Sequence, residues 1–394
     1  MTDAPFSLTD LPFSAVPGAM TADEARDGAL LFRVARALAE TRLGVPVLVR
    51  GANPALEPTA VAMVPAESIS DAALAALAAL GTGEPVRVVL TGRRAAVLGL
   101  IGPDQPPLAV AVTLATAPDR ARIARLADPC LDLEGPLPAL ASVEPLPADS
   151  AAGAAVLLAK LARLLPAAVI CPVAWDRLGD GRPLAVEGAD VAEYQLAAAR
   201  SLRQVGEARV PLAGAEDTRI LAFRPADGGT EHVAIVVGTL DPSRPVLARL
   251  HSECFTGDLL GSLRCDCGDQ LRGAIEAIAA QGSGVLLYLA QEGRGIGLVN
   301  KLRAYQLQDQ GFDTLDANGQ LGFDDDERIY LPAARILSQL GITQVRLLTN
   351  NPLKVEALSR HGVDVVERVP HIYAPNPHNR RYLETKARRG GHLF

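Results

Sequence analysis

Three cysteines close together in the sequence are the residues best suited to chemistry. Cys254, Cys265 and Cys267 lie within fourteen residues of one another, whereas Cys130 and Cys171 are isolated. Thiolate is a soft ligand that suits zinc, and zinc is usually four-coordinate. Three protein ligands leave one position for water, which is the pattern of a catalytic zinc. Zinc would lower the pKa of that water to about 7 and so supply hydroxide at neutral pH.

Two other interpretations of the three cysteines are available. Free cysteine is often a small buried residue, but the polar and glycine neighbours of these three argue against that. A structural zinc site needs a fourth Cys or His at matching spacing, and His251 is the only nearby candidate. We expect a hairpin at Thr256, Gly257 and Asp258 to bring Cys254 back to the other two thiols.

A glycine-rich stretch is the second candidate for chemistry. It runs from Gln291 to Gly297 as QEGRGIG, between a predicted buried strand at 285–289 and a predicted helix at 298–308. Backbone N–H groups at such a helix start bind anions, and Arg294 adds positive charge. A glycine-rich loop alone is a weak signal. Together with Glu292 and the cysteines, it indicates a site for an anionic substrate.

The stretch from Arg249 to Gly268, RLHSECFTGDLLGSLRCDCG, resembles GTP cyclohydrolase II, which opens the guanine ring at the start of riboflavin synthesis. The resemblance covers residues 206–394. It continues through Gln291–Gly297, Asn300–Tyr305 (NKLRAY), Leu321–Arg328 (LGFDDDER), Leu347–Pro352 (LLTNNP) with Lys354, and Arg381–Lys386 (RYLETK).

This resemblance implies three catalytic residues. Tyr305 would serve complete deformylation, Asp326 would accept a proton, and Arg328 would be the nucleophile that takes the guanylyl group as pyrophosphate leaves. Because arginine stays protonated, an electrostatic role of Arg328 on the α-phosphate is the alternative.

The resemblance also implies the substrate contacts and the cofactors. The metal ligands would be Cys254, Cys265 and Cys267, holding one catalytic Zn²⁺ per subunit, and Mg²⁺ would accompany the triphosphate of GTP. We expect a homodimer, because the family is dimeric. The implied substrate-binding residues are Arg249, Glu253, Gln270, Glu292, Gly293, Arg294, Thr314, Thr349 and Lys354.

The composition bounds the class of protein. The chain has 394 residues, 49% of them hydrophobic and 21% charged, and a net charge of −7. This charge argues against a general nucleic-acid binder. No apolar run is long enough for a membrane span, the N-terminus lacks the features of a secretory signal, and clustered thiols suit a reducing compartment. We therefore expect a cytoplasmic protein of two domains.

The first half shows strands alternating with helices. Thr21 and Glu24 form a predicted capping box before a helix over 22–42, and further helices are predicted over 72–80, 151–164 and 190–205. Strands are predicted over 45–49, 86–90 and 167–171. This order predicts an α/β (mixed α+β) fold of two domains, each a mixed sheet with packed helices. The predicted domains are residues 1–205 and 206–394.

The first half also resembles 3,4-dihydroxy-2-butanone-4-phosphate synthase. The similarity lies in Ala60–Ser70 (AVAMVPAESIS), Val88–Gly99 (VVLTGRRAAVLG), Ala117–Ala121 (APDRA), and Gly153–Pro166 (GAAVLLAKLARLLP) with Val169–Cys171.

The residues that the synthase family uses for catalysis are missing. Its acidic metal-binding stretch falls on Gly51–Thr59, where only Glu57 is acidic, and its Gly-His-Thr-Glu segment falls on Ser150–Gly153. The acid after the strand ending in Cys171 is replaced by Pro172. Enolisation of a sugar phosphate would then lack both base and metal. We interpret residues 1–205 as a degenerate, non-catalytic synthase-like domain.

Three alternatives to a GTP cyclohydrolase II remain. A variant cyclohydrolase could retain the formyl group, but the presence of Tyr305 argues against it. A non-catalytic nucleotide-binding or regulatory protein is the second, although the site residues of the second half are intact. A bifunctional enzyme that also converts ribulose 5-phosphate is the third.

Overall fold

The computed structural model describes residues 21–394, except residues 57, 105, 180–181, 381–383, 385–386, 389–390, 392 and 394. Glu57 and most of the segment Arg381–Lys386 therefore lie outside the described residues.

The first half forms one mixed sheet, whose strand order among the described residues is β5-β4-β3-β6-β2-β1-β7. All neighbours are antiparallel except β1 and β7, which are parallel. The strands are β1 (Val47–Arg50), β2 (Ala60–Pro65), β3 (Arg87–Thr91), β4 (Ala109–Leu114), β5 (Leu140–Leu146), β6 (Ala167–Pro172) and β7 (Ala185–Glu187). The helices are α1 (Ala22–Leu43), α2 (Asp71–Leu80), α3 (Gly92–Val97), α4 (Arg120–Ala127), α5 (Ala151–Leu161) and α6 (Gly188–Arg200).

The second half forms a second mixed sheet, whose described strands have the order β14-β13-β11-β12-β10-β9-β8. The four strands from β14 to β12 are parallel, and the remaining neighbours are antiparallel. The strands are β8 (Arg203–Arg209), β9 (Thr218–Arg224), β10 (His232–Val237), β11 (Val246–Ser252), β12 (Gly284–Leu289), β13 (Gln344–Leu348) and β14 (Asp364–Val369). The helices are α7 (Phe255–Asp258), α8 (Cys267–Gln281), α9 (Leu298–Asp309), α10 (Thr314–Gln320), α11 (Leu331–Gln339) and α12 (Pro352–Arg360).

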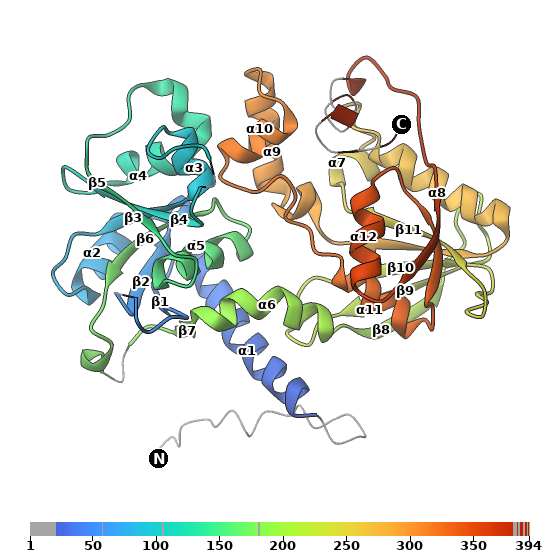
Figure 1. Ribbon diagram of the computed structural model, residues 1–394, viewed down its shortest axis with the longest axis horizontal. Coiled ribbons are helices and arrows are strands. Elements are labelled where there is room, and N and C mark those ends of the chain that lie inside the picture. Colours follow the sequence, from blue (N-terminus) through green and yellow to red (C-terminus); the bar gives the residue numbers. More distant parts are fainter. Residues whose placement is uncertain are drawn as a thin grey trace.

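Both sheets are covered by helices on their two faces, which confirms the predicted mixed α/β class (Figure 1). Alternate residues of each strand point to opposite faces. In β6, Ala168 and Ile170 pack in the cluster that includes α1 and α5, whereas Val169 packs in the cluster that includes α2 and α4. In the second sheet, α11 and α12 cover one face and α8 covers the other.

The predicted helices of the first half are largely confirmed. Thr21 and Glu24 form the capping box of α1, whose chain then leaves the helix at the left-handed Gly44. The helix expected over 190–205 is wrong at its end, because α6 stops at Arg200 and β8 begins at Arg203. The backbone of 203–209 pairs with β9 instead of continuing the helix. The expected domain boundary after residue 205 falls inside that strand, and the division into two domains stays a prediction.

Two helices of the second half stand between the sheets. In Figure 1, α9 and α10 lie between the first sheet and the second. Leu165, from the first half, is buried in an apolar cluster with six residues of the second half: Ile296, Ala304, Leu307, Ala317, Leu321 and Phe323. The first half therefore completes the packing of α9 and α10.

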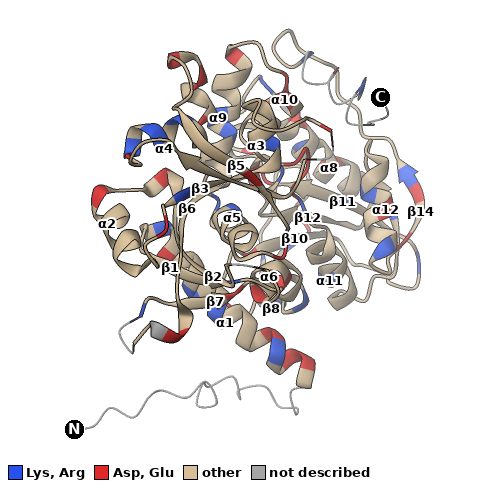
Figure 2. Ribbon diagram, turned by 60° about the vertical axis from the view of Figure 1, so that its left-hand side comes forward, with Lys and Arg blue, Asp and Glu red and all other residues tan. Residues whose placement is uncertain are grey.

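Within the described part of the chain, every helix is too short or too polar to cross a lipid bilayer. Figure 2 shows that acidic and basic residues are interspersed over both halves.

Candidate active site

Three neighbouring parallel strands place the candidate residues at one edge of the second sheet. Glu253 and Cys254 follow β11, Gln291 to Arg294 follow β12, and Thr349 to Lys354 follow β13. Because the carboxyl ends of parallel strands meet at the same edge, loops far apart in the sequence converge there, where open α/β sheets bind ligands. The pocket at this edge is lined by all three clustered cysteines and by residues from each of these loops.

The three thiols come together as the sequence predicts. Cys254, Cys265 and Cys267 have their sulfur atoms within 4.8 Å of one another, and this is the one His/Cys/Asp/Glu cluster suited to a metal that we find among the described residues. The expected hairpin is wrong: Cys254 instead precedes the short helix α7, and Cys267 begins α8. Helical turns therefore present the thiols, and the Asp258 side chain holds the backbone at Cys254.

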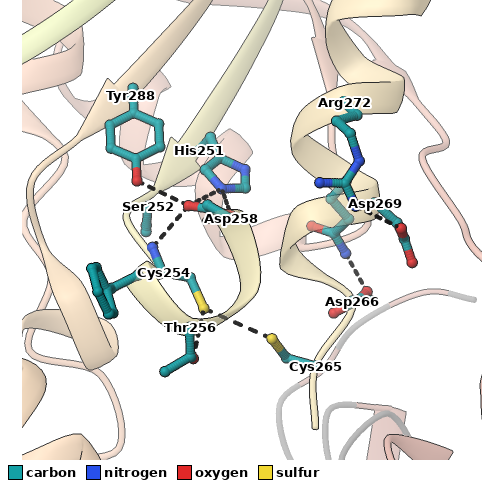
Figure 3. Close-up of polar contacts among 12 residues, drawn as sticks. His251, Ser252, Cys254, Thr256, Asp258, Cys265, Asp266, Asp269, Arg272 and Tyr288 are labelled. Atoms are coloured by element: carbon teal, nitrogen blue, oxygen red, sulfur yellow. Dashed lines mark hydrogen bonds and ion pairs between the residues drawn. The ribbon is translucent and has the colours of Figure 1, made fainter. Parts of the chain in front are cut away.

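A buried polar network lies behind Cys254 (Figure 3). The Asp258 carboxylate accepts hydrogen bonds from the Cys254 N–H (2.9 Å) and the Tyr288 hydroxyl (2.9 Å), and it contacts His251 Nε2 at 3.0 Å. The His251 and Asp258 side chains are only 3% and 6% exposed. His251 therefore binds Asp258 and is not part of the thiol cluster, and the network fixes the backbone at Cys254.

The donor set fits a zinc ion. Three sulfur ligands at this spacing suit zinc, and Gly257 provides the room for them. A Cβ at Gly257 would lie 2.8 Å from the Cys265 sulfur and 3.0 Å from the Cys254 sulfur. A side chain at residue 257 would displace the ligands, so glycine is required by this close approach.

Lys301 is a site residue to which the sequence analysis gave no role. Its ammonium group lies 3.1 Å from Cys254 Sγ, 3.1 Å from Thr256 Oγ1 and 2.8 Å from Glu292 Oε1. Burial alone would lower the pKa of Lys301, but Glu292 and Cys254 more than offset it and raise the pKa. Lys301 is therefore protonated at neutral pH. The sequence did offer one indication of this role: Lys301 lies one helical turn before Tyr305, so the two side chains share a face of the helix.

The thiol pKa values differ within the cluster. Hydrogen bonds from the Cys265 and Cys267 thiols, together with Lys301, lower the pKa of Cys254. The pKa of Cys265 is raised to about 11, chiefly by its hydrogen bond with Cys254. Cys254 is thus the preferred thiolate, and the thiolate is the form that binds metals.

The glycine-rich loop is held by its own side chains. Glu292 Oε2 accepts from the Phe255 N–H (2.6 Å), which joins the loop to the cysteine segment. Gly293 and Arg294 both adopt left-handed backbone conformations, with φ of 63°. This conformation costs a non-glycine residue free energy, and it directs the Arg294 guanidinium to the Asp325 carbonyl at 3.2 Å.

Another wall of the pocket comes from β11, α8 and the loop after β13. Arg249 donates to the Leu348 carbonyl (2.8 Å) and to Gln270 Oε1 (2.5 Å), while its Nε has no hydrogen-bond partner among the described residues. Burial lowers the pKa of Arg249 to about 10, so it is still cationic at neutral pH. Lys354 donates to the Leu250 carbonyl at 2.8 Å, and Thr349 is buried beside it.

Asp326 and Arg328 form a two-pronged ion pair. Arg328 Nε lies 2.7 Å from Asp326 Oδ1 and Nη2 lies 2.5 Å from Oδ2. Burial raises the pKa of Asp326, but the hydrogen bonds and charge of Arg328 outweigh it and leave the pKa lowered. Arg328 also donates to Ser252 Oγ (3.3 Å) and lines the pocket. Asp326 is not among the lining residues and is connected to the pocket by its ion pair with Arg328.

Tyr305 and Glu253 also line the pocket. The Tyr305 hydroxyl lies 3.4 Å from Thr256 Oγ1, and burial raises the pKa of this phenol. Burial and the nearby Glu292 raise the pKa of Glu253. Thr314 begins α10, but its side chain lies outside the described part of the structure.

Comparison with known proteins identifies the family of this chain. A protein from Azospirillum brasilense named GTP cyclohydrolase-2 is 53% identical over 375 residues, which cover 93% of this chain and 95% of that protein. The chain belongs to the GTP cyclohydrolase II family. The family model described as GTP cyclohydrolase II matches residues 203–370.

Other relatives match about half of the chain. Proteins named GTP cyclohydrolase-2 from Shigella boydii and Escherichia coli are 54% identical over 193 residues, covering 49% of this chain and 98% of theirs. Among solved structures, a two-domain 3,4-dihydroxy-2-butanone 4-phosphate synthase from A. baumannii covers 86% of this chain and 100% of its own, at 16% identity and a TM-score of 0.31.

Proposed function

We propose that this protein hydrolyses GTP to formate, pyrophosphate and 2,5-diamino-6-ribosylamino-4(3H)-pyrimidinone 5′-phosphate, as a zinc-dependent GTP cyclohydrolase II of riboflavin biosynthesis. The observation on which the proposal depends is the cluster of three thiols beside Lys301, in a pocket lined by five further cationic residues: Arg249, Arg264, Arg294, Arg328 and Lys354. Family membership supports the same reaction.

Cys254, Cys265 and Cys267 would hold the zinc ion. Zinc supplies Lewis acidity that activates water for attack on C8 of guanine. Lys301 stabilises negative charge at Cys254, because its ammonium lies 3.1 Å from that sulfur. Asp258 keeps the backbone of Cys254 in place through a 2.9 Å hydrogen bond. These residues organise the ligands before substrate arrives.

The cationic residues would bind the anionic substrate. Buried Arg249 lines the pocket, and its Nε has no hydrogen-bond partner within the described part of the chain, so this residue suits a substrate oxygen. Arg328 stays protonated beside Asp326, so we assign it electrostatic stabilisation of the α-phosphate rather than nucleophilic attack. Mg²⁺ would accompany the triphosphate, and Gln270, Glu253, Thr314 and Thr349 would contact the nucleotide.

Tyr305 would assist release of the formyl group. Because its pKa is raised, the phenol is protonated at neutral pH and can donate a hydrogen bond or a proton to the amide being cleaved. This role favours complete deformylation over a formamide product.

Formate release from GTP by zinc-loaded protein with Mg²⁺ tests the proposal. We expect formate from the wild type and none from Cys254→Ser, because that variant loses a ligand and the charge partner of Lys301. Cys130→Ser is the matched control, since this thiol lies in the first half and burial raises its pKa to about 11. It should retain both zinc and activity.

The outcomes separate the alternatives. GTP consumption without formate indicates the cyclohydrolase that retains the formyl group. If zinc-loaded wild type binds GTP but does not consume it, the protein is a nucleotide-binding regulator and the proposal is wrong.

The first half, in this proposal, has no synthase activity. We expect no 3,4-dihydroxy-2-butanone 4-phosphate from ribulose 5-phosphate and Mg²⁺, because Ser150 to Gly153 supply neither carboxylate nor imidazole. Formation of that product at a rate comparable to formate release would establish a bifunctional enzyme instead.

The same proposal describes the protein as a cytoplasmic homodimer with no nucleic-acid or membrane partner. Three reduced thiols suit a reducing compartment. Light scattering coupled to size exclusion would give a mass of two chains.

A further inference from the structure

A short segment of the first half contacts two loops of the second half that contain candidate site residues. We define this segment, Lys160–Leu165, as the α5 tip, because it spans the end of α5 and the turn that follows. Its polar contacts with the second half are with the stretch Ala290–Asn300 and with Glu327, in the loop that contains Asp326. Neither stretch is near the tip in sequence.

The first contact is an ion pair at the loop that contains Asp326. Lys160 Nζ lies 2.8 Å from Glu327 Oε1, and their side chains are only 16% and 19% exposed. The same Glu327 oxygen accepts from the Asp324 N–H at 2.7 Å. The Glu327 N–H donates to the Arg294 carbonyl at 3.1 Å. Glu327 thus connects the tip, the turn before Asp326 and the glycine-rich loop.

The second contact is with the glycine-rich loop and the start of α9. Arg163 donates to the Ala290 carbonyl at 3.2 Å. Asn300 Nδ2 lies 3.3 Å from the Arg163 carbonyl and 3.4 Å from that of Leu164. The Leu165 N–H donates to Glu67 Oε2 at 2.7 Å, and Glu67 also pairs with Arg303 of α9 at 3.1 Å.

Packing reinforces these polar contacts. Leu165 is 2% exposed, and its apolar neighbours all come from Ile296–Phe323, the region of the second half that includes Tyr305. The part of the pocket wall that this region forms therefore packs against the first half rather than against the second sheet.

We propose that the α5 tip is a positioning element for the reaction, in which Lys160 acts through Glu327 to orient Asp326 and Arg328, and Arg163 acts through the Ala290 carbonyl to orient the glycine-rich loop. This inference rests on the proposed function and gives the first half a role in it. Lys160 and Arg163 do not line the pocket, so they are positioning residues rather than catalytic ones.

The arrangement predicts an effect on kcat more than on KM. Gln270, Thr349 and Lys354 belong to the wall built on the second sheet, which the tip does not contact, so most ground-state binding of GTP persists. Orientation of Asp326 and Arg328 matters in the transition state, where displacement by about 1 Å can cost 100-fold. A loss in kcat at constant KM is the signature of an interaction used only in the transition state.

The test compares two full-length variants with equally buried cations. Lys160→Met removes the ion pair with Glu327, and Arg87→Met removes a pair with Glu144 inside the first sheet. The Lys160 and Arg87 side chains are each 16% exposed. We expect Lys160→Met to lower kcat for formate release at least about tenfold, with KM for GTP within about threefold. Arg87→Met should keep the kcat of the wild type.

Three further variants separate positioning from loss of folding. Lys160→Arg and the charge exchange Lys160→Glu with Glu327→Lys should both recover most of kcat. Arg163→Gly removes the guanidinium but suits the left-handed φ of 63°, so its melting temperature should match the wild type while its kcat falls. A wild-type kcat in both Lys160→Met and Arg163→Gly would overturn the proposal.

Amide hydrogen exchange distinguishes failure of this inference from failure of the proposed function. In nucleotide-free protein, Lys160→Met should speed exchange over residues 290–300 and 324–328, and Arg87→Met should not. If the wild type releases no formate but this exchange difference is present, the contacts hold and the assigned reaction is wrong. If formate is released but exchange and kcat are unchanged in Lys160→Met, positioning by the tip is refuted.

Discussion

The cysteines of the two halves show how similar folds differ in chemistry. Cys171, in a first-half strand, donates to the Leu77 carbonyl, and burial raises its pKa to about 11. Cys254 lies beyond a strand end, next to two thiols and Lys301, and its pKa is lowered. Both halves are mixed sheets covered by helices. A fold therefore does not specify a reaction, and the loops at strand ends decide it.

The segment Ser150–Gly153 illustrates the same difference. Ser150 caps α5 by accepting from the Gly153 N–H at 3.0 Å. A Cβ at Gly153 would lie 2.6 Å from the Ala148 carbonyl oxygen. In this structure the segment contributes to helix formation and close packing.

The largest predicted effect comes from the buried charge of the second half. Lys301→Met leaves Glu292 without its cation and Cys254 without its nearest positive charge. Removing one partner of a buried pair costs about 3–5 kcal/mol of unfolding free energy, and we expect formate release to fall at least about 100-fold. Urea unfolding and zinc analysis measure both. An active variant with normal zinc content would show that Lys301 is only structural.

A comparison of two leucines tests whether the first half supports the second. Leu158→Ala and Leu165→Ala should each cost about 2–5 kcal/mol in urea unfolding, because both side chains are fully buried. Only Leu165→Ala should also speed amide exchange in α9 and α10, since its neighbours are there. Equal exchange patterns in the two variants would contradict this difference.

Two glycines sharpen the contrast between a constrained site and a permissive helix. Gly257→Ala brings a methyl group against two sulfur ligands, so we expect about tenfold weaker zinc affinity, equivalent to about 1.4 kcal/mol. Gly28 has no heavy atom within 4 Å of an added Cβ, and Gly28→Ala should stabilise α1 by about 0.5–1 kcal/mol. Zinc titration measures the first effect and thermal unfolding the second. Equal zinc affinity and equal stability in the two variants would contradict the contrast.

A further predicted effect concerns the part of the acid stability that depends on histidines, and these lie in the second half alone. All six histidines lie after residue 231, and burial lowers the pKa of His232 and His371 to about 4. The unfolded chain binds protons near pH 6.5, so this stability is complete above that pH and is lost as pH falls toward 4. As the pH falls from 7 to 5, the lowered pKa of each of these two histidines should reduce the unfolding free energy by about 1–2 kcal/mol.

Replacing one of these histidines tests whether it causes the loss of stability at low pH. His371→Gln should flatten the dependence of urea unfolding on pH between 7 and 5. An unchanged slope in that variant would show that other groups cause the loss of stability.

The sequence by itself determined the thiol cluster and most of the local structure. Cys254, Cys265 and Cys267 could be chosen because thiol chemistry and spacing are local properties. The capping box of α1 and the apolar strand predicted over 167–171, observed as β6, followed from patterns of adjacent residues. The end of α6 was predicted wrongly, because pairing of 203–209 with β9 competes with helix formation there.

Tertiary structure alone decided which groups surround those thiols. Lys301 meets Cys254 across 47 residues, and Lys160 meets Glu327 across a larger separation between the two halves. Such contacts depend on how parallel strands bring their ends to one edge and on how α9 packs against the first half. No local pattern encodes that convergence, since it arises from the burial of whole helix and strand faces.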